Sequence, residues 1–212
     1  MRVLLLLLCL GLAPAARAGG EPPGIFDHWI LALSWSPGWC AAEGAARGSP
    51  QCDSDRRLGW ILHGLWPQYE TGWPSECPTG AAPPSATLAR EMSAIMGTTG
   101  LVHHEWRRHG TCSGLSARAY FDRSRTAYDS IALPRALRSE DRPDRLPARA
   151  VEAAFLEANP GLEPDMITIT CKAGRIREAR ICLHRETLRP IPCGRDTRRD
   201  CRLKDALLDP IP

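Results

Sequence analysis

The chain of 212 residues is 43% hydrophobic and 24% charged, the proportions of a soluble globular protein rather than of a disordered chain. Its length suits one domain of ordinary size. The formal net charge is only +3, so overall charge does not by itself predict binding to a polyanion.

An apolar run begins the chain. Residues 3–12 follow Arg2, are too few to span a bilayer, and lead to Ala16-Arg17-Ala18, the small-x-small pattern of a secretory cleavage site. We therefore expect residues 1–18 to be a signal peptide and residues 19–212 to form a secreted or periplasmic domain with no membrane span. Removing the leader takes two of the 27 basic residues and none of the 24 acidic ones, which leaves a net charge of +1.

Two strands are predicted early in the mature chain. Trp29, Leu31, Leu33 and Trp35 alternate with His28, Ile30, Ala32 and Ser34, the period-two pattern of a strand. A loop over residues 40–57 separates this strand from a second alternating run over residues 58–65, which contains His63. Residues 67–84 are rich in Pro, Gly, Ser and Thr, so we expect a long exposed loop there.

Helical periodicity dominates the middle of the chain. Ser85 can cap a helix that runs to about Met96, and a Gly-Thr-Thr-Gly break at residues 97–100 precedes a helix over about residues 103–108. A longer amphipathic helix is predicted over residues 116–131.

The last third mixes both element types. A charged, proline-punctuated loop over residues 138–147 leads to a helix over residues 147–158. Strands over residues 166–171 and 175–183 are joined through Ala173-Gly174 as a hairpin, and a proline-rich tail follows. No repeat or linker divides the chain, so we predict a single α+β domain.

The cysteines predict disulfide bonds. One of the nine lies in the leader, and an even set of eight in an exported chain indicates four bridges rather than free thiols. No C-x-x-C pair suggests a zinc site. The sequence alone does not choose the pairing among Cys40, Cys52, Cys77, Cys112, Cys171, Cys182, Cys193 and Cys201.

Two segments, residues 61–67 and 104–112, concentrate histidine beside polar partners. The second reads H-E-x-x-x-H rather than the H-E-x-x-H of zinc proteases, which places His104 and His109 roughly 140° apart on a helix, so we expect no metal site. Glu105 with His109, and His104 with Arg108, are instead spaced to share a helical face. A zinc-dependent hydrolase remains a disfavoured alternative.

Two histidines, one carboxylate and one guanidinium suit metal-free acid–base chemistry on a phosphodiester. RNA supplies its own nucleophile, the 2′-OH, so one imidazole can remove its proton while the other protonates the leaving oxygen. The sequence does not prove that the two segments meet. A bridge between Cys77 and Cys112 would hold the end of the second segment against the loop that follows the first.

These segments resemble a known family. Leu-His-Gly-Leu-Trp-Pro at residues 62–67 and His-Glu-Trp-x-x-His-Gly-Thr-Cys at residues 104–112 are similar to the two active-site segments of the ribonuclease T2 family. Residues 33–40 and 176–182 resemble its first and a late strand. The resemblance implies an α+β fold with an antiparallel sheet packed by helices. It also implies endonucleolytic cleavage of single-stranded RNA through 2′,3′-cyclic phosphates, without metal or cofactor.

Carried over by position, the resemblance implies that His63 is the histidine acid and His109 the histidine base. Glu105 and His104 correspond to groups that steady the phosphate. Arg108 stands where the family usually has lysine, so it keeps the charge in a bulkier planar group. Trp66 corresponds to an aromatic that stacks on a base.

The loop after Trp66 carries further candidate base-binding residues. Gln68 stands where some members carry an aspartate that reads a base edge, and Tyr69 and Trp73 could stack on bases or simply pack. The implied disulfide scheme is Cys40–Cys52, Cys77–Cys112, Cys171–Cys201 and Cys182–Cys193. We expect a monomer that does not cleave DNA. The main rival is a non-enzymatic RNA-binding or defence protein on the same fold.

Overall fold

The computed structural model describes residues 20–134, 137 and 144–211. The predicted signal peptide, residues 1–18, lies outside the described residues. Within the described ranges, no helix is both long enough and apolar enough to cross a membrane.

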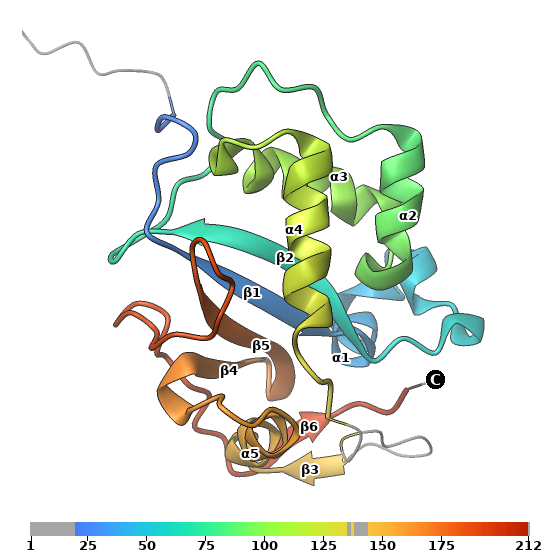
Figure 1. The fold of residues 1–212 in the computed structure, drawn as a ribbon. Coiled ribbons are helices and arrows are strands. Elements are labelled where there is room, and N and C mark those ends of the chain that lie inside the picture. The colour runs from blue at the N-terminus through green and yellow to red at the C-terminus, as the bar shows by residue number, and fades with distance from the viewer. Residues whose placement is uncertain (1–19, 135–136, 138–143, 212) are drawn as a thin grey trace, which may run out of the picture.

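One sheet of six strands runs through the molecule (Figure 1). Its order is β2-β1-β5-β6-β3, and β4 also pairs with β5. The strands are β1 His28–Trp35, β2 Trp60–Gln68, β3 Asp144–Leu146, β4 Ile167–Lys172, β5 Arg175–His184 and β6 Ala206–Leu208. All pairings are antiparallel except the short contact of β5 with β6.

Helices cover this sheet at both ends. Figure 1 shows α2, α3 and α4 gathered near β2 and β1, whereas α5 lies at the other end beside β3 and β6. The helices are α1 Ser36–Trp39, α2 Ala86–Met96, α3 Thr99–Arg108, α4 Ala117–Asp129 and α5 Ala148–Ala158. Shorter helical turns are Cys40–Gly44, Pro50–Cys52, Ser54–Arg56, Gly110–Ser113 and Pro164–Met166. The predicted α+β single domain is confirmed.

The helix that carries the second histidine segment begins earlier than the sequence indicated. α3 starts at Thr99 rather than near His103, because the Thr98 hydroxyl accepts a hydrogen bond from the Leu101 backbone N–H at 3.1 Å and caps the helix. Gly97, at φ +90°, ends the preceding helix. Within the predicted four-residue break, Gly97 therefore ends α2 and Thr98 caps the start of α3.

Three strand predictions need correction. β2 begins at Trp60 and continues to Gln68, because it is an edge strand on which Pro67 can sit without removing a ladder hydrogen bond. Asp144–Leu146, expected to be loop, pairs with Ala206–Leu208 in the tail. These short strands lack a run of alternation long enough to show in the sequence.

The two faces of the sheet bury different side chains. Trp29, Leu31 and Leu33 of β1 join the main hydrophobic core together with side chains of α2, α4 and α5. Ile30 and Ala32, which point to the opposite face, pack in a small cluster with Trp66 and the Cys182–Cys193 pair. Trp66, together with Gly64 and Arg180, which pair with Ala32, lies on this second face of the sheet.

Two β-bulges change which face the side chains reach. Opposite β1, the partner of Ala32 is Gly64 but the partner of Leu33 is Leu62, so His63 is an extra residue on β2. Opposite β4, pairing jumps in the same way from Glu178 to Ile176. A bulge leaves one residue out of the ladder and re-aims its side chain.

The four disulfides match the scheme that the family resemblance implies. The bridges are Cys40–Cys52, Cys77–Cys112, Cys171–Cys201 and Cys182–Cys193. The Ala173-Gly174 hairpin is also confirmed, since both residues have the positive φ that a tight antiparallel turn requires.

Candidate active site

The two histidine segments meet around the carboxylate of Glu105. This side chain points from α3 into the protein and is 1% exposed. The Trp66 indole N–H donates a hydrogen bond to Glu105 Oε2 at 2.8 Å, and His63 Nε2 lies 3.5 Å from Glu105 Oε1. The predicted proximity of the two segments is therefore present in the structure, with the Cys77–Cys112 bridge just beyond His109.

His63 has a second acidic partner that the sequence analysis did not single out. Its Nδ1 lies 2.8 Å from Oε1 of Glu178, on β5. Arg180 donates two further hydrogen bonds to Glu178 Oε2, at 2.7 and 3.0 Å. One feature of β5 could have indicated the contact between Glu178 and His63. Ile176 and Ala179, three residues apart, both belong to the main core, whereas regular alternation would place core residues two apart. Such a change of phase indicates a β-bulge between them.

Electrostatics favour a protonated His63. Burial alone would lower the pKa of its imidazole, but the hydrogen bond to Glu178 and the charge of Glu105 outweigh burial and raise this pKa above 6.5. Burial would likewise raise the pKa of Glu178, yet His63 and Arg180 hold it at about 2. Burial raises the pKa of Glu105 to about 7.

His109 occupies the opposite electrostatic setting. It follows the last residue of α3, and its ring stacks on Trp66 with centroids 5.1 Å apart. Burial, together with the positive charges of His63 and Arg108, lowers the pKa of His109 to about 3. The surroundings therefore raise the pKa of one imidazole and lower that of the other, although both lie beside the same tryptophan.

The other two predicted groups of this segment lie at its outer edge. Burial and the nearby His63 charge lower the pKa of His104, which is exposed on α3. Arg108 forms an exposed ion pair with Glu76 at 3.1 Å rather than contacting His104. Among the residues that the structure describes, no three His, Cys, Asp or Glu side chains are grouped so as to hold a metal ion.

A cavity of about 260 Å³ opens beside His109, and we call it the Trp66 cavity. It is lined by Ile30, Trp66, Gln68, Trp73, Arg108, His109, Arg180, Asp196 and Thr197. Trp66 is only 9% exposed and carries the Arg180 guanidinium over its ring at 5.1 Å, whereas Trp73 is 54% exposed. Tyr69 packs against the main core instead. Of the predicted base-binding residues, Trp66, Gln68 and Trp73 therefore reach the cavity.

The tail completes this cavity, which sequence analysis did not foresee. Asp196 accepts a hydrogen bond from the backbone N–H of Gly72 at 2.9 Å and so ties the loop that carries Trp73 to the segment after Cys193. The Cys182–Cys193 bridge anchors that segment to β5. The contact joins residues 124 positions apart, so no local pattern could show it.

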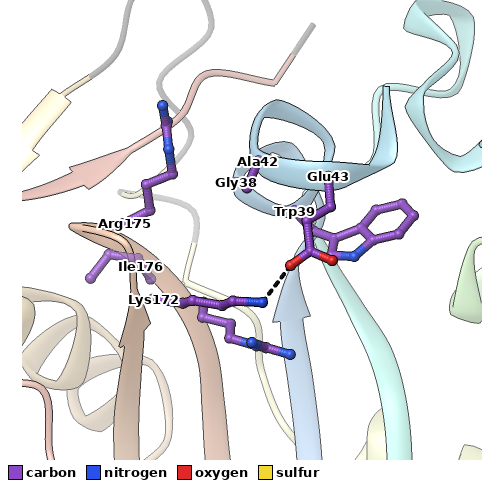
Figure 2. A pocket seen from close by; sticks show the side chains of 8 residues that line it. Gly38, Trp39, Ala42, Glu43, Lys172, Arg175 and Ile176 are labelled. Atoms are coloured by element: carbon purple, nitrogen blue, oxygen red, sulfur yellow. Dashed lines mark hydrogen bonds and ion pairs between the residues drawn. The ribbon is translucent and has the colours of Figure 1, made fainter. Parts of the chain in front are cut away.

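A second hollow lies between α1 with the turn after it and the β4–β5 hairpin (Figure 2). Lys172 spans it to Glu43 at 2.5 Å. Arg175 lies at its rim and pairs with Asp209. The cationic side chains that line this hollow are each paired with a carboxylate, Lys172 with Glu43, Arg175 with Asp209 and Arg177 with Glu178.

Gly64 gives a sharp test of the packing around Glu105. A Cβ at this position would overlap Glu105 Oε2 and lie 2.5 Å from Trp66 Nε1, so Gly64→Ala must break or displace their hydrogen bond. We expect a loss of about 1–3 kcal/mol in the free energy of unfolding. Denaturant unfolding monitored by tryptophan fluorescence measures it. Gly80→Ala, where a Cβ meets nothing within 4 Å, is the matched control, and equal stability of the two variants would contradict the geometry.

Residues 26–193 match the profile of the Ribonuclease T2 family. The chain belongs to the ribonuclease T2 family. The matched range includes both histidine segments and Glu178, whereas Asp196 and Thr197 of the cavity wall lie beyond it.

Two curated relatives are bacterial. The chain is 45% identical over 120 residues to a protein named Ribonuclease from Aeromonas hydrophila, covering 55% of this chain and 53% of that one. It is 34% identical over 129 residues to a Probable ribonuclease from Haemophilus influenzae, covering 54% of this chain and 47% of that one. The matches thus span about half the length of these relatives.

Solved structures show the same fold. An RNase-related protein from Calystegia sepium has a TM-score of 0.65 at 21% identity, covering 88% of this chain and 97% of that chain. RNase NT, solved in complex with 5′-AMP, has a TM-score of 0.64 at 21% identity, covering 86% of this chain and 97% of that chain. At these identities the likeness supports the fold alone.

Proposed function

We propose that the protein is a secreted, metal-independent endoribonuclease that cleaves single-stranded RNA by attack of the ribose 2′-OH. The observation that carries the proposal is an asymmetry between two histidines that share one tryptophan. His63 has carboxylates within 2.8 and 3.5 Å, whereas His109 packs against the indole ring. Acid–base cleavage needs one imidazole that holds a proton and one that does not.

The roles follow from this asymmetry. His109, neutral, takes the proton from the 2′-OH as that oxygen attacks phosphorus. His63, protonated, gives its proton to the departing 5′ oxygen, and a 2′,3′-cyclic phosphate remains. Water then opens the cyclic ester to a 3′-phosphate with the two histidines in exchanged roles. Neither step requires a metal or a cofactor.

Charge on the phosphate needs stabilisation during the attack. We assign this to Glu105, His104 and Arg108. Glu105 has a pKa raised by burial to about 7, so its carboxyl group can carry a proton and donate a hydrogen bond to a phosphate oxygen. Arg108 lines the cavity next to His109 and supplies positive charge there.

The Trp66 cavity is the proposed site of a nucleobase. Trp73 offers an exposed aromatic face, and Gln68 presents an amide at the cavity wall. Trp66 is only 9% exposed and Tyr69 packs against the main core, so base stacking on either would require a rearrangement. The 5′-AMP bound by RNase NT is consistent with a nucleotide site on this fold.

The proposed function is tested by the chemistry of the products. Purified mature protein is incubated in EDTA with a 5′-labelled single-stranded RNA, and the new ends are identified by mass spectrometry. Internal fragments ending in 2′,3′-cyclic phosphate support the proposal. Loss of cleavage in EDTA would favour a metal-dependent hydrolase, and RNA retention without cleavage would favour the non-enzymatic binding protein.

Arg108 provides a prediction of intermediate size. Its ion pair with Glu76 is exposed on both sides and contributes little to stability, so the guanidinium is free to turn to a phosphate. We expect Arg108→Ala to lower kcat on the order of 10–1000-fold, by analogy with removal of an oxyanion donor, and Arg108→Lys to keep most activity. Arg107→Ala, the neighbouring exposed arginine, is the control. Unchanged kcat in Arg108→Ala would show that this side chain forms only its surface ion pair with Glu76 and does not stabilise the phosphate.

A further inference from the structure

Glu178 is a buried charge that the proposed mechanism has not used. Its side chain is 1% exposed, and it lies within ion-pair distance of three cationic groups, His63 at 2.8 Å, Arg180 at 2.7 Å and Arg177 at 3.7 Å. A buried carboxylate is costly unless it is paired and hydrogen-bonded, so such an arrangement calls for an explanation.

The contact between Glu178 and His63 crosses an intervening strand. β1 lies between β2 and β5, which places the backbones that carry the two side chains about 10 Å apart. Both residues lie at β-bulges. Beneath the contact, β1 presents Ala32, paired with Gly64 on one side and Arg180 on the other, and a small residue there leaves room for the two side chains to meet.

The two oxygens of Glu178 have different partners. Oε2 accepts both hydrogen bonds from Arg180, and Oε1 is left for His63 Nδ1. Because Nδ1 is held in this way, Nε2 is the nitrogen that faces Glu105 and the mouth of the site. A carboxylate that merely paired with Arg180 would not need to direct its second oxygen at a histidine two strands away.

We propose that Glu178 is a positioning residue, which holds His63 by Nδ1 and keeps it protonated so that its Nε2–H can be delivered to the leaving oxygen. This proposal rests on the proposed function, because the leaving oxygen belongs to the RNA. Its structural part concerns only the orientation and proton affinity of His63 and stands on its own measurement.

Several charged or titratable groups face His63, and their charges decide in which direction its pKa moves when one of them is replaced. From β5 these are Glu178 with Arg177 and Arg180, and from α3 and the turn after it Glu105, His104 and His109. Glu178, and Glu105 when it is ionised, favour the imidazolium, whereas the Arg177 and Arg180 guanidiniums oppose it. His104 and His109 have lowered pKa values and are neutral at pH values above them, so they add little positive charge there. Neutralising Glu178 leaves Arg177 and Arg180 near His63 without their counter-charge, so the His63 pKa must fall.

The experiment is an NMR titration of His63 in the whole mature protein, with its signal assigned by comparison with His63→Phe. In Glu178→Gln the pKa of His63 should fall by about 1–3 pH units, because either orientation of the amide removes the negative charge. In Arg180→Gln it should rise, because Glu178 then keeps its charge with one competing cation fewer. Glu43→Gln, the carboxylate that pairs with Lys172 across the hollow in Figure 2, should leave it unchanged.

Turnover provides the second measurement. In Glu178→Gln the alkaline limb of the kcat/KM profile should shift to lower pH together with the His63 pKa. At pH values below that limb, most of the turnover should be kept. Glu178→Ala, which loses the hydrogen bond as well, should lose on the order of 100-fold at every pH. Thermal unfolding of each variant separates this effect from a general loss of folded protein.

The outcomes separate the two proposals. A wild-type protein that does not cleave RNA would refute the proposed function, while the titration would still decide whether Glu178 governs His63. An unchanged His63 pKa in both Glu178→Gln and Arg180→Gln would overturn the present inference even in an active enzyme. If Glu178→Gln fails to fold, the upward shift in Arg180→Gln carries the decision, and its absence overturns the inference.

Discussion

Replacing either His63 or His109 with phenylalanine is expected to lower kcat by about 100- to 10,000-fold, the contribution of one general acid or base. Phenylalanine keeps the planar ring, so His109→Phe should preserve the stacking on Trp66. The measurement is initial-rate cleavage of a dinucleotide with the folded state checked by circular dichroism. His103→Phe, on α3 but outside the site, is the control.

The two losses should differ with the leaving group. A nucleoside 3′-phosphate ester of 4-nitrophenol releases an anion that is stable without a proton, so it does not require a general acid. We expect His63→Phe to recover much of its activity on this ester and His109→Phe to recover little. Equal recovery in both variants would contradict the assignment of acid and base.

The same assignment sets the pH profile. His109 must be neutral, and its pKa of about 3 puts the acid limb of kcat/KM well below 6.5. His63 must be protonated, and its raised pKa puts the alkaline limb above 6.5. Activity therefore rises as pH passes the His109 pKa and falls as pH passes the His63 pKa. An acid limb near pH 6 would show that burial does not keep His109 neutral in the free enzyme.

Local sequence patterns predicted the strands and helices that bury one regular face. β4 alternates isoleucine with threonine at its start, and α4 carries an apolar stripe along one face. The start of α3 is not predicted correctly, because Gly100 resembles part of a break, whereas the Thr98 cap decides where that helix begins. β3 and β6 were missed because each gains its stability from the other, far along the chain.

The candidate site also contains residues that local sequence patterns reveal and residues that only the fold reveals. His63, Glu105 and His109 were recognisable because two short segments carry unusual side chains at fixed spacing, although their meeting depends on the fold. Glu178 was not recognisable, because its role depends on a β-bulge and on its contact with His63, which is 115 residues away in the sequence. Asp196 likewise reaches the Trp66 cavity only through the Cys182–Cys193 bridge.

The largest effect is expected when the substrate loses its own nucleophile. A 2′-deoxy sugar on the 5′ side of one phosphate should reduce cleavage of that bond on the order of 10⁵-fold or more, because an internal hydroxyl competes at a very high effective concentration with external water. All other bonds in the strand should be cut at their normal rates, and DNA should not be cut.

A single labelled RNA with one deoxy position, incubated with the protein in EDTA and resolved on a sequencing gel, measures every bond in one lane. The all-ribose strand of the same sequence is the control for local preference at the Trp66 cavity. Protection confined to the deoxy position would follow from attack by the 2′-OH that His109 deprotonates. Cleavage there at a rate near that of its neighbours would mean that His109 activates water, and Nε2 of His63 would then protonate the leaving oxygen of a direct hydrolysis instead.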